Sequence, residues 1–460
     1  MNLETISHIG EKVVISGWVN TRRDMGKITF FDMRDRSGLL QVVIVPSELD
    51  DASRELVSGI RSEYCLRITG LVQARGAKQV NPNLPTGTVE LLAKKIEILN
   101  PSKTPPFELE DTANINEELR MKYRYLDLRS PRMQKNLILR DKVISFFRDY
   151  LHAAGFIEVE TPYITKGTPE GAREFLIPSR QQPGKFYALP QSPQQFKQLL
   201  MVGGIEKYFQ VARCFRDEDQ RGDRQPEFTQ LDLEMSFVER EDVLKLVEDM
   251  MIKMVKEVTP EKRIQQIPFP RISYKEAMDK YGSDKPDLRE DKTDPNLLAF
   301  AWIVDFPFFE RTDDGGWTFS HNPFSKPNDE HMEWLMEKSN IPEIMTQQYD
   351  LVLNGYEAGG GSIRNHQPEA LKKVFEIMGL SAEDIQSQFG HILEAFTYGA
   401  PPHGGIAPGI DRLVMLLAGE PNIREVIAFP KTGDARDLMM NAPAELPKKS
   451  LDEVHIQIKK

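Results

Sequence analysis

Hydrophobic and polar residues in the first hundred positions follow the pattern of short β-strands separated by turns. A short helical stretch, Ser53–Ile60, falls between the third and fourth apolar runs. The predicted strands are Val13–Arg23, Lys27–Asp35, Leu39–Pro46, Tyr64–Arg75 and Val89–Leu99. Five strands with a helix after the third are the order of an OB-fold barrel, a frequent binder of single-stranded nucleic acid.

Three prolines between Pro101 and Pro106 interrupt this pattern, and they can continue neither a helix nor a central strand. We therefore predict a stiff linker over residues 101–115, between a barrel at 1–100 and a larger domain at 116–460.

In the larger domain, the spacing of apolar residues is helical in some segments and typical of strands in others. Apolar residues between Leu139 and Tyr150 recur at steps of four, three and four, which predicts an amphipathic helix ending near Gly155. A second helix is marked by the apolar positions from Val243 to Val258. Strands are predicted at Ile157–Glu160, Phe209–Cys214, Thr229–Phe237, Ala301–Phe306 and Tyr349–Asn354. Non-adjacent strands with helices between them indicate an α+β domain built on one mixed sheet.

Composition limits the class of protein. The 460 residues are 40% hydrophobic and 28% charged, as in soluble globular proteins of two or three domains. Only Cys65 and Cys214 are present, which excludes a disulfide framework and a cysteine-based zinc site. No apolar run reaches the length of a membrane span, and the first residues lack a signal-peptide pattern, so we expect a cytoplasmic protein without a membrane partner.

The net charge of −11 argues against a wholly basic surface for nucleic-acid binding. Residues 1–100 carry 13 Lys and Arg against 12 Asp and Glu, a balance of +1, so a polyanion is tolerated best there.

One charged segment lies between two predicted strands and contains Arg216, Glu218, Arg224 and Phe228. Such a loop is most often only solvated. The alternative is a nucleotide site, in which an arginine fork holds phosphate and Phe228 offers its face to a base. No P-loop, GxSxG or HExxH motif competes with this interpretation.

Two further segments contain glycine beside charged residues. Gly359–Gly361 lies between Glu357 and Arg364 and indicates either a flexible turn or a close approach of backbone to a ligand. Gly404–Leu413 contains Arg412 and indicates either a helix start packed in the core or an anion-binding helix N-terminus.

A fourth segment, Gln191–Gln198, places Lys197 on a helix for which Ser192 is the expected N-cap. A lone helical lysine is usually a surface residue. In the barrel, a set of basic, aromatic and amide side chains has two interpretations. It either stacks on and hydrogen-bonds to bases, or it is an ordinary barrel surface with one core aromatic. That set is Arg22, Arg23, Phe30, Gln41 and Asn81.

Together these segments resemble the three motifs of class II aminoacyl-tRNA synthetases. Gly155–Pro162 is similar to the first motif, which lies at the family's dimer interface, Phe215–Glu218 to the second, and Gly405–Arg412 to the third. The resemblance narrows to the bacterial-type members that use aspartate. It rests on Tyr123–Arg129, Thr168–Arg173, Tyr187–Lys197, Arg224–Gln230 and Tyr281–Arg289.

The resemblance implies a role for each matching residue. In the ATP site, Arg216 would hold the α-phosphate and Arg412 the γ-phosphate, Phe228 would stack on adenine, and Glu218 would lie beside them. Mg²⁺ would be held by Asp350 and Glu357, so that the residues acting in catalysis are Arg216, Arg412 and Glu357. The side-chain carboxylate of aspartate would meet Arg364 and Lys197. The remaining aspartate-site residues are Ser192, Gln194, Asp232, His321 and Glu170, the last on a mobile loop.

The implied activity is the ATP-dependent activation of L-aspartate and its transfer to tRNA-Asp by a homodimer with Pro162 at its interface, with tRNA-Asn left open as a second acceptor. The barrel would read the anticodon through Arg23, Phe30, Gln41 and Asn81. The alternatives are an asparagine-specific relative, an inactive RNA-binding paralogue, and an amide-forming ligase.

Two departures from the family pattern concern the larger domain. A domain-sized insertion is expected between the second and third motifs, but only a few polar residues join Arg289 to Leu297. The family's His-His-Pro-Phe segment reads His321-Asn322-Pro323-Phe324, which leaves the role of Asn322 open.

Overall fold

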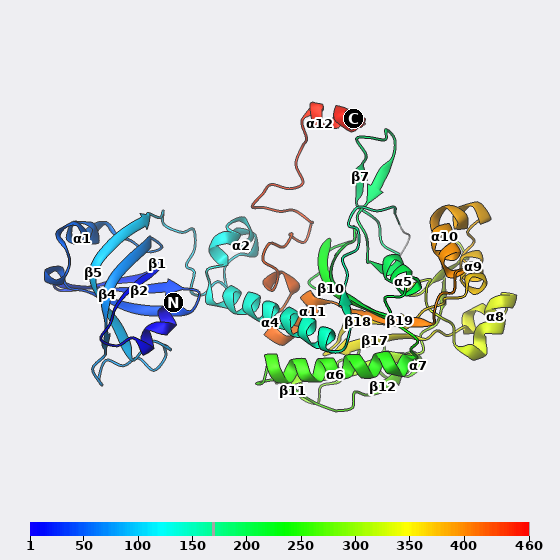
Figure 1. Ribbon diagram of the computed structural model, residues 1–460, viewed down its shortest axis with the longest axis horizontal. Helices are drawn as coiled ribbons and strands as arrows, with labels where there is room; N and C mark the ends of the chain where they lie inside the picture. Colours follow the sequence, from blue (N-terminus) through cyan, green and yellow to red (C-terminus); the bar gives the residue numbers. More distant parts are fainter. Residues whose placement is uncertain (168–170, 460) are drawn as a thin grey trace. The chain divides into compact units, whose positions relative to one another are not determined.

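The computed structural model describes residues 1–167 and 171–459 (Figure 1). The chain divides into two compact units, residues 1–115 and 116–460.

The first unit is a closed five-stranded barrel with the strand order β1-β2-β3-β5-β4. Every pairing is antiparallel except that of β3 with β5. Its elements are β1 (Lys12–Met25), β2 (Ile28–Asp35), β3 (Gly38–Ile44), α1 (Asp51–Leu56), β4 (Cys65–Ala74) and β5 (Val89–Asn100). Alternate residues such as Phe31 and Met33 are fully buried inside. The predicted OB-fold order, with its helix after the third strand, is confirmed.

The second unit is built on an eight-stranded sheet with the order β12-β14-β17-β18-β19-β10-β9-β6. The two outermost pairs are parallel and the pairs between them antiparallel, so the predicted mixed, mainly antiparallel sheet is confirmed. The strands are β6 (Ile157–Glu158), β9 (Lys207–Phe215), β10 (Glu227–Ser236), β12 (Arg271–Ser273), β14 (Phe300–Val304), β17 (Gln348–Leu353), β18 (Tyr356–Ile363) and β19 (His403–Pro408). Strand β6 is shorter than the predicted Ile157–Glu160.

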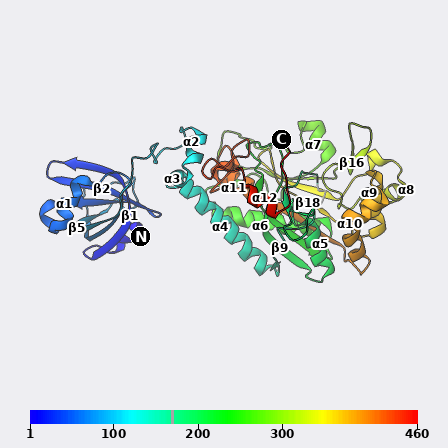
Figure 2. The ribbon, with the colours of Figure 1, turned by 90° about the horizontal axis from the view of Figure 1, so that it is seen from above.

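Helices α4 (Pro131–Ala153) and α6 (Arg240–Val258) lie side by side against one face of this sheet (Figures 1 and 2). The side chain of Ser130 caps α4, and Gly155, at φ +82°, follows its end as predicted. Residues of α4, α6 and α11 (Ile410–Ala418) share one apolar core with the strands.

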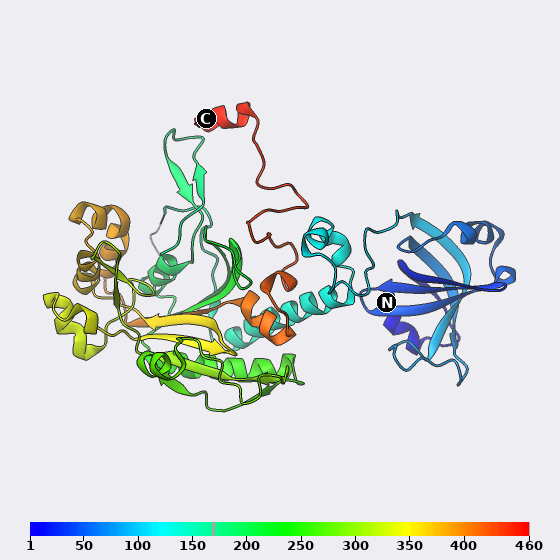
Figure 3. The same ribbon diagram turned by 180° about the vertical axis from the view of Figure 1, so that it is seen from behind.

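Most of the remaining elements of this unit flank the sheet, whereas α12 (Lys448–Glu453) lies at the end of an extended C-terminal segment away from it (Figures 1 and 3). The other helices are α2 (Glu117–Lys122), α3 (Arg124–Asp127), α5 (Gln194–Val202), α7 (Tyr274–Tyr281), α8 (Met332–Glu337), α9 (Pro368–Ile377) and α10 (Ala382–Phe396). Three small strand pairs are β7 (Leu176–Pro178) with β8 (Phe186–Ala188), β11 (Arg263–Ile264) with β13 (Leu297–Leu298), and β15 (Phe309–Arg311) with β16 (Trp317–Phe319). No helix in the described parts of the chain has both the length and the apolar character needed to cross a membrane.

Strand alternation separates the core face of the sheet from a polar face. On β10, Leu231 and Leu233 point into the core shared with α6, so Asp232 and Glu234 point to the opposite side. On β17, Tyr349 and Leu351 belong to the core and Asp350 faces the polar side. This polar face is where the sequence-predicted site residues gather.

Candidate functional site

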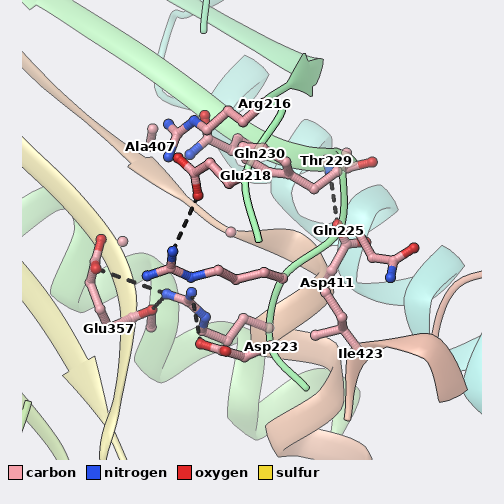
Figure 4. A pocket seen from close by; sticks show the side chains of 16 residues that line it. Arg216, Glu218, Asp223, Gln225, Thr229, Gln230, Glu357, Ala407, Asp411 and Ile423 are labelled. Carbon is pink, nitrogen blue, oxygen red and sulfur yellow. Dashed lines mark hydrogen bonds and ion pairs between the residues drawn. The ribbon is translucent and has the colours of Figure 1, made fainter. Parts of the chain in front are cut away.

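One cavity on the polar face is lined by Arg216, Phe228, Glu357 and Arg412, and its volume is about 210 Å³ (Figure 4). The guanidinium carbon of Arg216 lies 5.0 Å from the centroid of the Phe228 ring, a cation–π distance. Within the described residues, the buried Nε atoms of Arg216 and Arg412 have no hydrogen-bond partner. The cavity therefore presents two cations with unused donors beside an aromatic face, a combination that suits a nucleotide.

Arg412 is held in place by residues on either side of the cavity. It lies in the first turn of α11, its Nη2 is 3.1 Å from Asp223 Oδ2, and its Nη1 donates to the carbonyl of Glu357. In the loop between β9 and β10, Arg224 Nη1 lies 3.2 Å from Glu218 Oε2. The loop thus contributes acidic partners as well as Arg216.

Asp411, next to Arg412, joins three elements. Its Oδ2 accepts a hydrogen bond of 2.8 Å from the backbone N–H of Thr229 on β10, and its Oδ1 pairs with Arg140 of α4. The sequence did not single out Asp223, Asp411 or Arg140 because their partners lie 182 to 271 residues away in the chain.

The three consecutive glycines lie inside strand β18, so the flexible-turn interpretation was wrong and the turn is formed by Asn354 and Gly355. A Cβ on Gly359 would come within 2.8 Å of the Cα of Pro408. A Cβ on Gly360 would lie 3.1 Å from Asp350 Oδ1 and 3.4 Å from Glu357 Oε1. The glycines therefore allow close packing of β18 on β19 and leave room where two carboxylates converge.

The convergence of Asp350 and Glu357 is the feature that could hold a cation. Although 44% of the Glu357 side-chain surface is accessible, desolvation by surrounding protein and the charge of Asp350 raise the pKa of this carboxyl. A divalent cation would relieve that repulsion. Among the described residues no group of three or more His, Cys, Asp or Glu side chains could hold a metal, so such an ion would complete its coordination with water or a bound phosphate.

His321 lies on the other side of Asp350. Its Nε2 is 3.5 Å from Asp350 Oδ2, and its ring meets that of Phe306 edge-to-face at 4.4 Å. Burial alone would lower the pKa of His321, but the hydrogen bond and charge of Asp350 raise it above the ordinary value.

A buried ion cluster lies further along the polar face. Lys197 Nζ is 2.8 Å from Asp232 Oδ2 and 3.3 Å from Glu234 Oε2. Arg364 binds Glu234 with two hydrogen bonds, of 2.9 Å from Nε and 3.1 Å from Nη2, and its Nη1 donates to Ser362 Oγ. These four side chains are almost fully buried, so the surface position expected of a lone helical lysine was wrong. Both cations are already paired, and the cluster is neutral as a whole.

The two carboxyls of this cluster differ in their ionisation. Burial raises the pKa of Asp232, despite the charge of Lys197. Burial would also raise the pKa of Glu234, but the charges of Arg364 and Lys197 lower it below its usual range. Asp232 Oδ1 is buried and lacks a hydrogen-bond partner within the part of the chain described, so one acceptor remains for a donor from outside the cluster.

The other residues expected around the amino group of aspartate have different positions. Pro193, not Ser192, is the N-cap of α5, although Ser192 Oγ accepts a 3.3 Å bond from Gln194 N. The side chain of Gln194 donates to Gln198, whose amide in turn meets Nε2 of His403. Glu170 lies outside the described residues.

In the barrel, Arg23, Phe30 and Gln41 share the outer face of strands β1, β2 and β3. Arg23 pairs with Phe30 across the strands and donates to Asp32 at 3.0 Å and to Gln41 at 3.3 Å. Phe30 is therefore not the core aromatic, a position filled by its neighbour Phe31. Arg22 instead donates to the carbonyls of Val57 and Ile60, and Asn81 lies in the loop between β4 and β5.

The matches to protein families fall on the same two units that the internal contacts of the chain define. A family described as tRNA synthetases class II (D, K and N) matches residues 116–433, and an OB-fold nucleic acid binding domain matches residues 13–99.

Curated relatives match nearly the whole chain. The aspartate–tRNA(Asp/Asn) ligase of Natranaerobius thermophilus is 42% identical over 98% of both chains, and the aspartate–tRNA ligase of Listeria welshimeri is 41% identical over 99% of this chain and 97% of its own. The first alignment has 577 positions, which exceeds the chain's 460 residues by 117. The relatives therefore contain at least that many residues without a counterpart here.

Solved structures share the fold at lower identity. Asparaginyl-tRNA synthetase from Pyrococcus horikoshii, complexed with asparaginyl-adenylate, has a TM-score of 0.74 at 24% identity and covers 93% of this chain and 96% of its own. A putative aspartyl-tRNA synthetase from Leishmania major has a TM-score of 0.72 at 22% identity and covers 93% and 92%. From the family match over the larger unit and the full-length relatives, we conclude that the chain belongs to the aspartate–tRNA ligase family of class II tRNA synthetases.

Proposed function

We propose that this protein activates L-aspartate with ATP to aspartyl-adenylate and transfers the aspartyl group to the 3′ end of tRNA-Asp. The observation that carries the proposal is the position of the buried Lys197–Asp232–Glu234–Arg364 cluster on the same sheet face as the cavity lined by Arg216 and Arg412. An amino-acid site and a nucleotide site on one face allow an attack between two bound substrates.

In the nucleotide site, Arg216 binds the α-phosphate and Arg412 the γ-phosphate. The unused Nε donors of both side chains support these roles, since phosphate oxygens would accept their hydrogen bonds. Phe228 stacks on adenine and Glu218 lines the same cavity. Asp350 and Glu357 would hold Mg²⁺, which when bound neutralises charge on the phosphates.

In the amino-acid site, Arg364 and Lys197 recognise the side-chain carboxylate of aspartate. Asp232 contributes its unpaired Oδ1 to the α-ammonium group, with Ser192, Gln194 and Glu170 around it, and His321 completes the site beside Asp350. Asparagine would bring an uncharged amide to the same two cations and would bind less well.

The first step is an in-line attack. An α-carboxylate oxygen of aspartate forms a bond to the α-phosphorus, and the bond to the β-phosphate bridging oxygen breaks, with pyrophosphate leaving. Arg216 stabilises the charge that develops on the α-phosphate, while Arg412 holds the departing pyrophosphate. A ribose hydroxyl at the tRNA 3′ end then attacks the carbonyl of the mixed anhydride and displaces AMP.

The barrel binds the anticodon through Arg23, Phe30, Gln41 and Asn81. Arg23 and Gln41 supply hydrogen-bonding groups beside the half-buried Phe30 ring, as single-stranded bases require. The names of the relatives include both tRNA-Asp alone and the Asp/Asn pair, so we keep tRNA-Asn as a second candidate acceptor.

We also propose that the enzyme works as a cytoplasmic homodimer with Pro162 at its interface. Pro162 is exposed, and apolar side chains next to it are exposed as well, among them Ile157 at 50%, Tyr163 at 43% and Ile164 at 56%. A second copy would cover them. Light scattering of wild-type protein and a Tyr163→Glu/Ile164→Glu variant tests this, and a monomeric wild-type protein would contradict it.

Amino-acid-dependent ATP–pyrophosphate exchange tests the activity. With Mg²⁺ present, aspartate should support exchange and asparagine should not. Exchange with asparagine would assign the Arg364 pocket to the other amino acid, and no exchange with either would favour an inactive RNA-binding protein. Charging of purified tRNA-Asp and tRNA-Asn then identifies the acceptor.

A further inference from the structure

Asn322 stands where the family resemblance led us to expect a second histidine, and its loop is fixed firmly against the polar face. Lys326 N donates to Ile363 O at 2.8 Å, and Asn365 N donates to Phe324 O at 2.8 Å. These backbone bonds fasten residues 324–326 to the end of β18 and the segment that follows it. The side chain of Asn322 is thereby brought to the start of β17.

The orientation of the Asn322 amide follows from one backbone group. The N–H of Phe324 lies 3.0 Å from Asn322 Oδ1, and a backbone N–H can only donate. The oxygen of the amide must therefore face Phe324, which leaves Nδ2 to donate to Gln348 Oε1 at 3.2 Å. Ser325 Oγ is also 3.2 Å from that oxygen.

The orientation of the Gln348 amide follows in turn. Because its oxygen receives these bonds, its Nε2 donates to Asp350 Oδ1 at 2.8 Å. Gln348 and Asp350 are two residues apart on β17, so their side chains share the polar face, and each is only 3% exposed. The series of hydrogen bonds begins at the backbone N–H of Phe324, which can only donate, and ends at the Asp350 carboxylate, which can only accept.

We infer that Asn322 and Gln348 are positioning residues for the divalent cation of ATP, which act by fixing the Asp350 carboxylate opposite Glu357. Nothing in the family match assigns them this role, and the inference rests on the metal site proposed above. A donor on Oδ1 sets the rotation of the carboxylate, in the way that partners of metal ligands generally orient them, while Oδ2 lies 3.5 Å from His321 Nε2. A Cβ on Gly360 would lie 3.6 Å from Gln348 Nε2, so the amide borders the same space as the two carboxylates.

The decisive substitution is Asn322→Asp. Its carboxylate can still accept from Phe324 N, but its second oxygen would face Gln348 Oε1, so the glutamine amide must turn and present its oxygen to Asp350. We expect Mn²⁺ to bind about 10- to 100-fold more weakly, the usual effect of losing a partner of a metal ligand. Mn²⁺ affinity is measured by electron paramagnetic resonance with α,β-methylene-ATP, which cannot form adenylate. Gln348→Leu, which removes the donor altogether, should weaken Mn²⁺ binding to a similar extent.

Ser325→Ala is the matched control, because it removes a hydroxyl that lies 3.2 Å from Gln348 Oε1 and 3.3 Å from Asn322 Oδ1 but keeps the backbone bond from Phe324 that orients the Asn322 amide. It should keep the Mn²⁺ affinity of wild type, and an equal loss in this variant would overturn the inference in favour of general loosening of the loop. Asp350→Ala separates the two proposals. If it weakens Mn²⁺ binding while Asn322→Asp and Gln348→Leu do not, the metal site stands and the positioning role fails. If it leaves Mn²⁺ affinity unchanged, the metal assignment itself fails, and the positioning role with it.

Discussion

At the scale of single residues, the interior of the catalytic unit accommodates a lysine and an arginine because each lies against a carboxylate. Lys197 meets Asp232, and Arg364 meets Glu234 with two parallel bonds. These pairings were not visible in the sequence, because Lys197 and Asp232 are 35 residues apart and Arg364 and Glu234 are 130 apart. One signal for Glu234 was present, since it occupies the same alternating face of β10 as Asp232.

Arg364→Ala should abolish aspartate-dependent exchange and also lower the stability of the catalytic unit. Breaking one side of a buried pair leaves Glu234 unpaired, at a cost in stability of about 3–5 kcal/mol. Losing the cation that meets the aspartate carboxylate should separately lower kcat/KM by roughly 100-fold or more. The double variant Arg364→Ala/Glu234→Ala should recover part of the thermal stability without recovering exchange. Near-wild-type aspartate kinetics in the single variant would refute the assignment.

His403 makes stability depend on pH. Its Nδ1 donates to the carbonyl of Pro401 at 2.7 Å, and burial lowers its pKa from 6.5 to about 4. The unfolded chain therefore takes up a proton between pH 6.5 and 4 that the folded protein excludes, so this part of the stability is present above pH 6.5 and is lost as the pH falls toward 4.

Urea unfolding at pH 7 and pH 5 measures this effect. Wild-type protein should lose about 2 kcal/mol from this histidine between the two pH values. His403→Gln should lack that part of the pH dependence, and an identical dependence in the variant would contradict the assigned pKa.

At the scale of elements, the sequence predicted the helices and strands whose hydrophobic periodicity is visible in it. The five barrel strands, α4 and α6 were found near their predicted bounds, because alternation and the helical repeat reflect burial directly. The glycine run was different. Whether Gly359–Gly361 forms a turn or a strand depends on its close packing against Pro408 and Gly405 of β19, which no local pattern encodes.

Asp411 provides a test of how elements position the nucleotide site. Asp411→Asn keeps an acceptor for the N–H of Thr229 but breaks the ion pair with Arg140, so the start of α11 is held less firmly against α4. Because Arg412 is the next residue, we expect KM for ATP to rise about tenfold, the scale of losing a partly buried charge pair. KM for aspartate should stay within about twofold, and an equal rise in both constants would indicate general destabilisation.

At the scale of the whole molecule, the chain consists of two units, and each has its own hydrophobic core. The barrel core and the catalytic core contain no common residue, and the two family matches fall on either side of the linker. The sequence predicted this division from composition, since the prolines between Pro101 and Pro106 interrupt every periodicity. It also indicated a missing insertion, in agreement with the 117 alignment positions that the relatives have in excess.

Phe30→Ala should therefore lower the rate of tRNA charging while leaving aspartate-dependent exchange unchanged. Loss of one base–aromatic stack costs about 1–3 kcal/mol, or roughly 5- to 150-fold in kcat/KM for tRNA. Val14→Ala is the matched control, because Val14 is an exposed apolar residue on β1 where that strand pairs with β4 rather than β2. Equal losses of tRNA charging and of aspartate-dependent exchange in Phe30→Ala would contradict separate roles for the barrel and the catalytic unit.

Three buried polar atoms, Arg216 Nε, Arg412 Nε and Asp232 Oδ1, have no hydrogen-bond partner among residues 1–167 and 171–459, and this has a consequence for denaturation. Each polar atom left unsatisfied in the interior disfavours the folded state by about 1–3 kcal/mol, and a substrate that satisfies it restores that amount. ATP and aspartate should act as thermal stabilisers, and a substrate at 100 times its Kd adds about 2.7 kcal/mol. Measuring the melting temperature with each amino acid in turn would then rank the amino acids by how well they fit the pocket. This measurement needs no catalytic turnover.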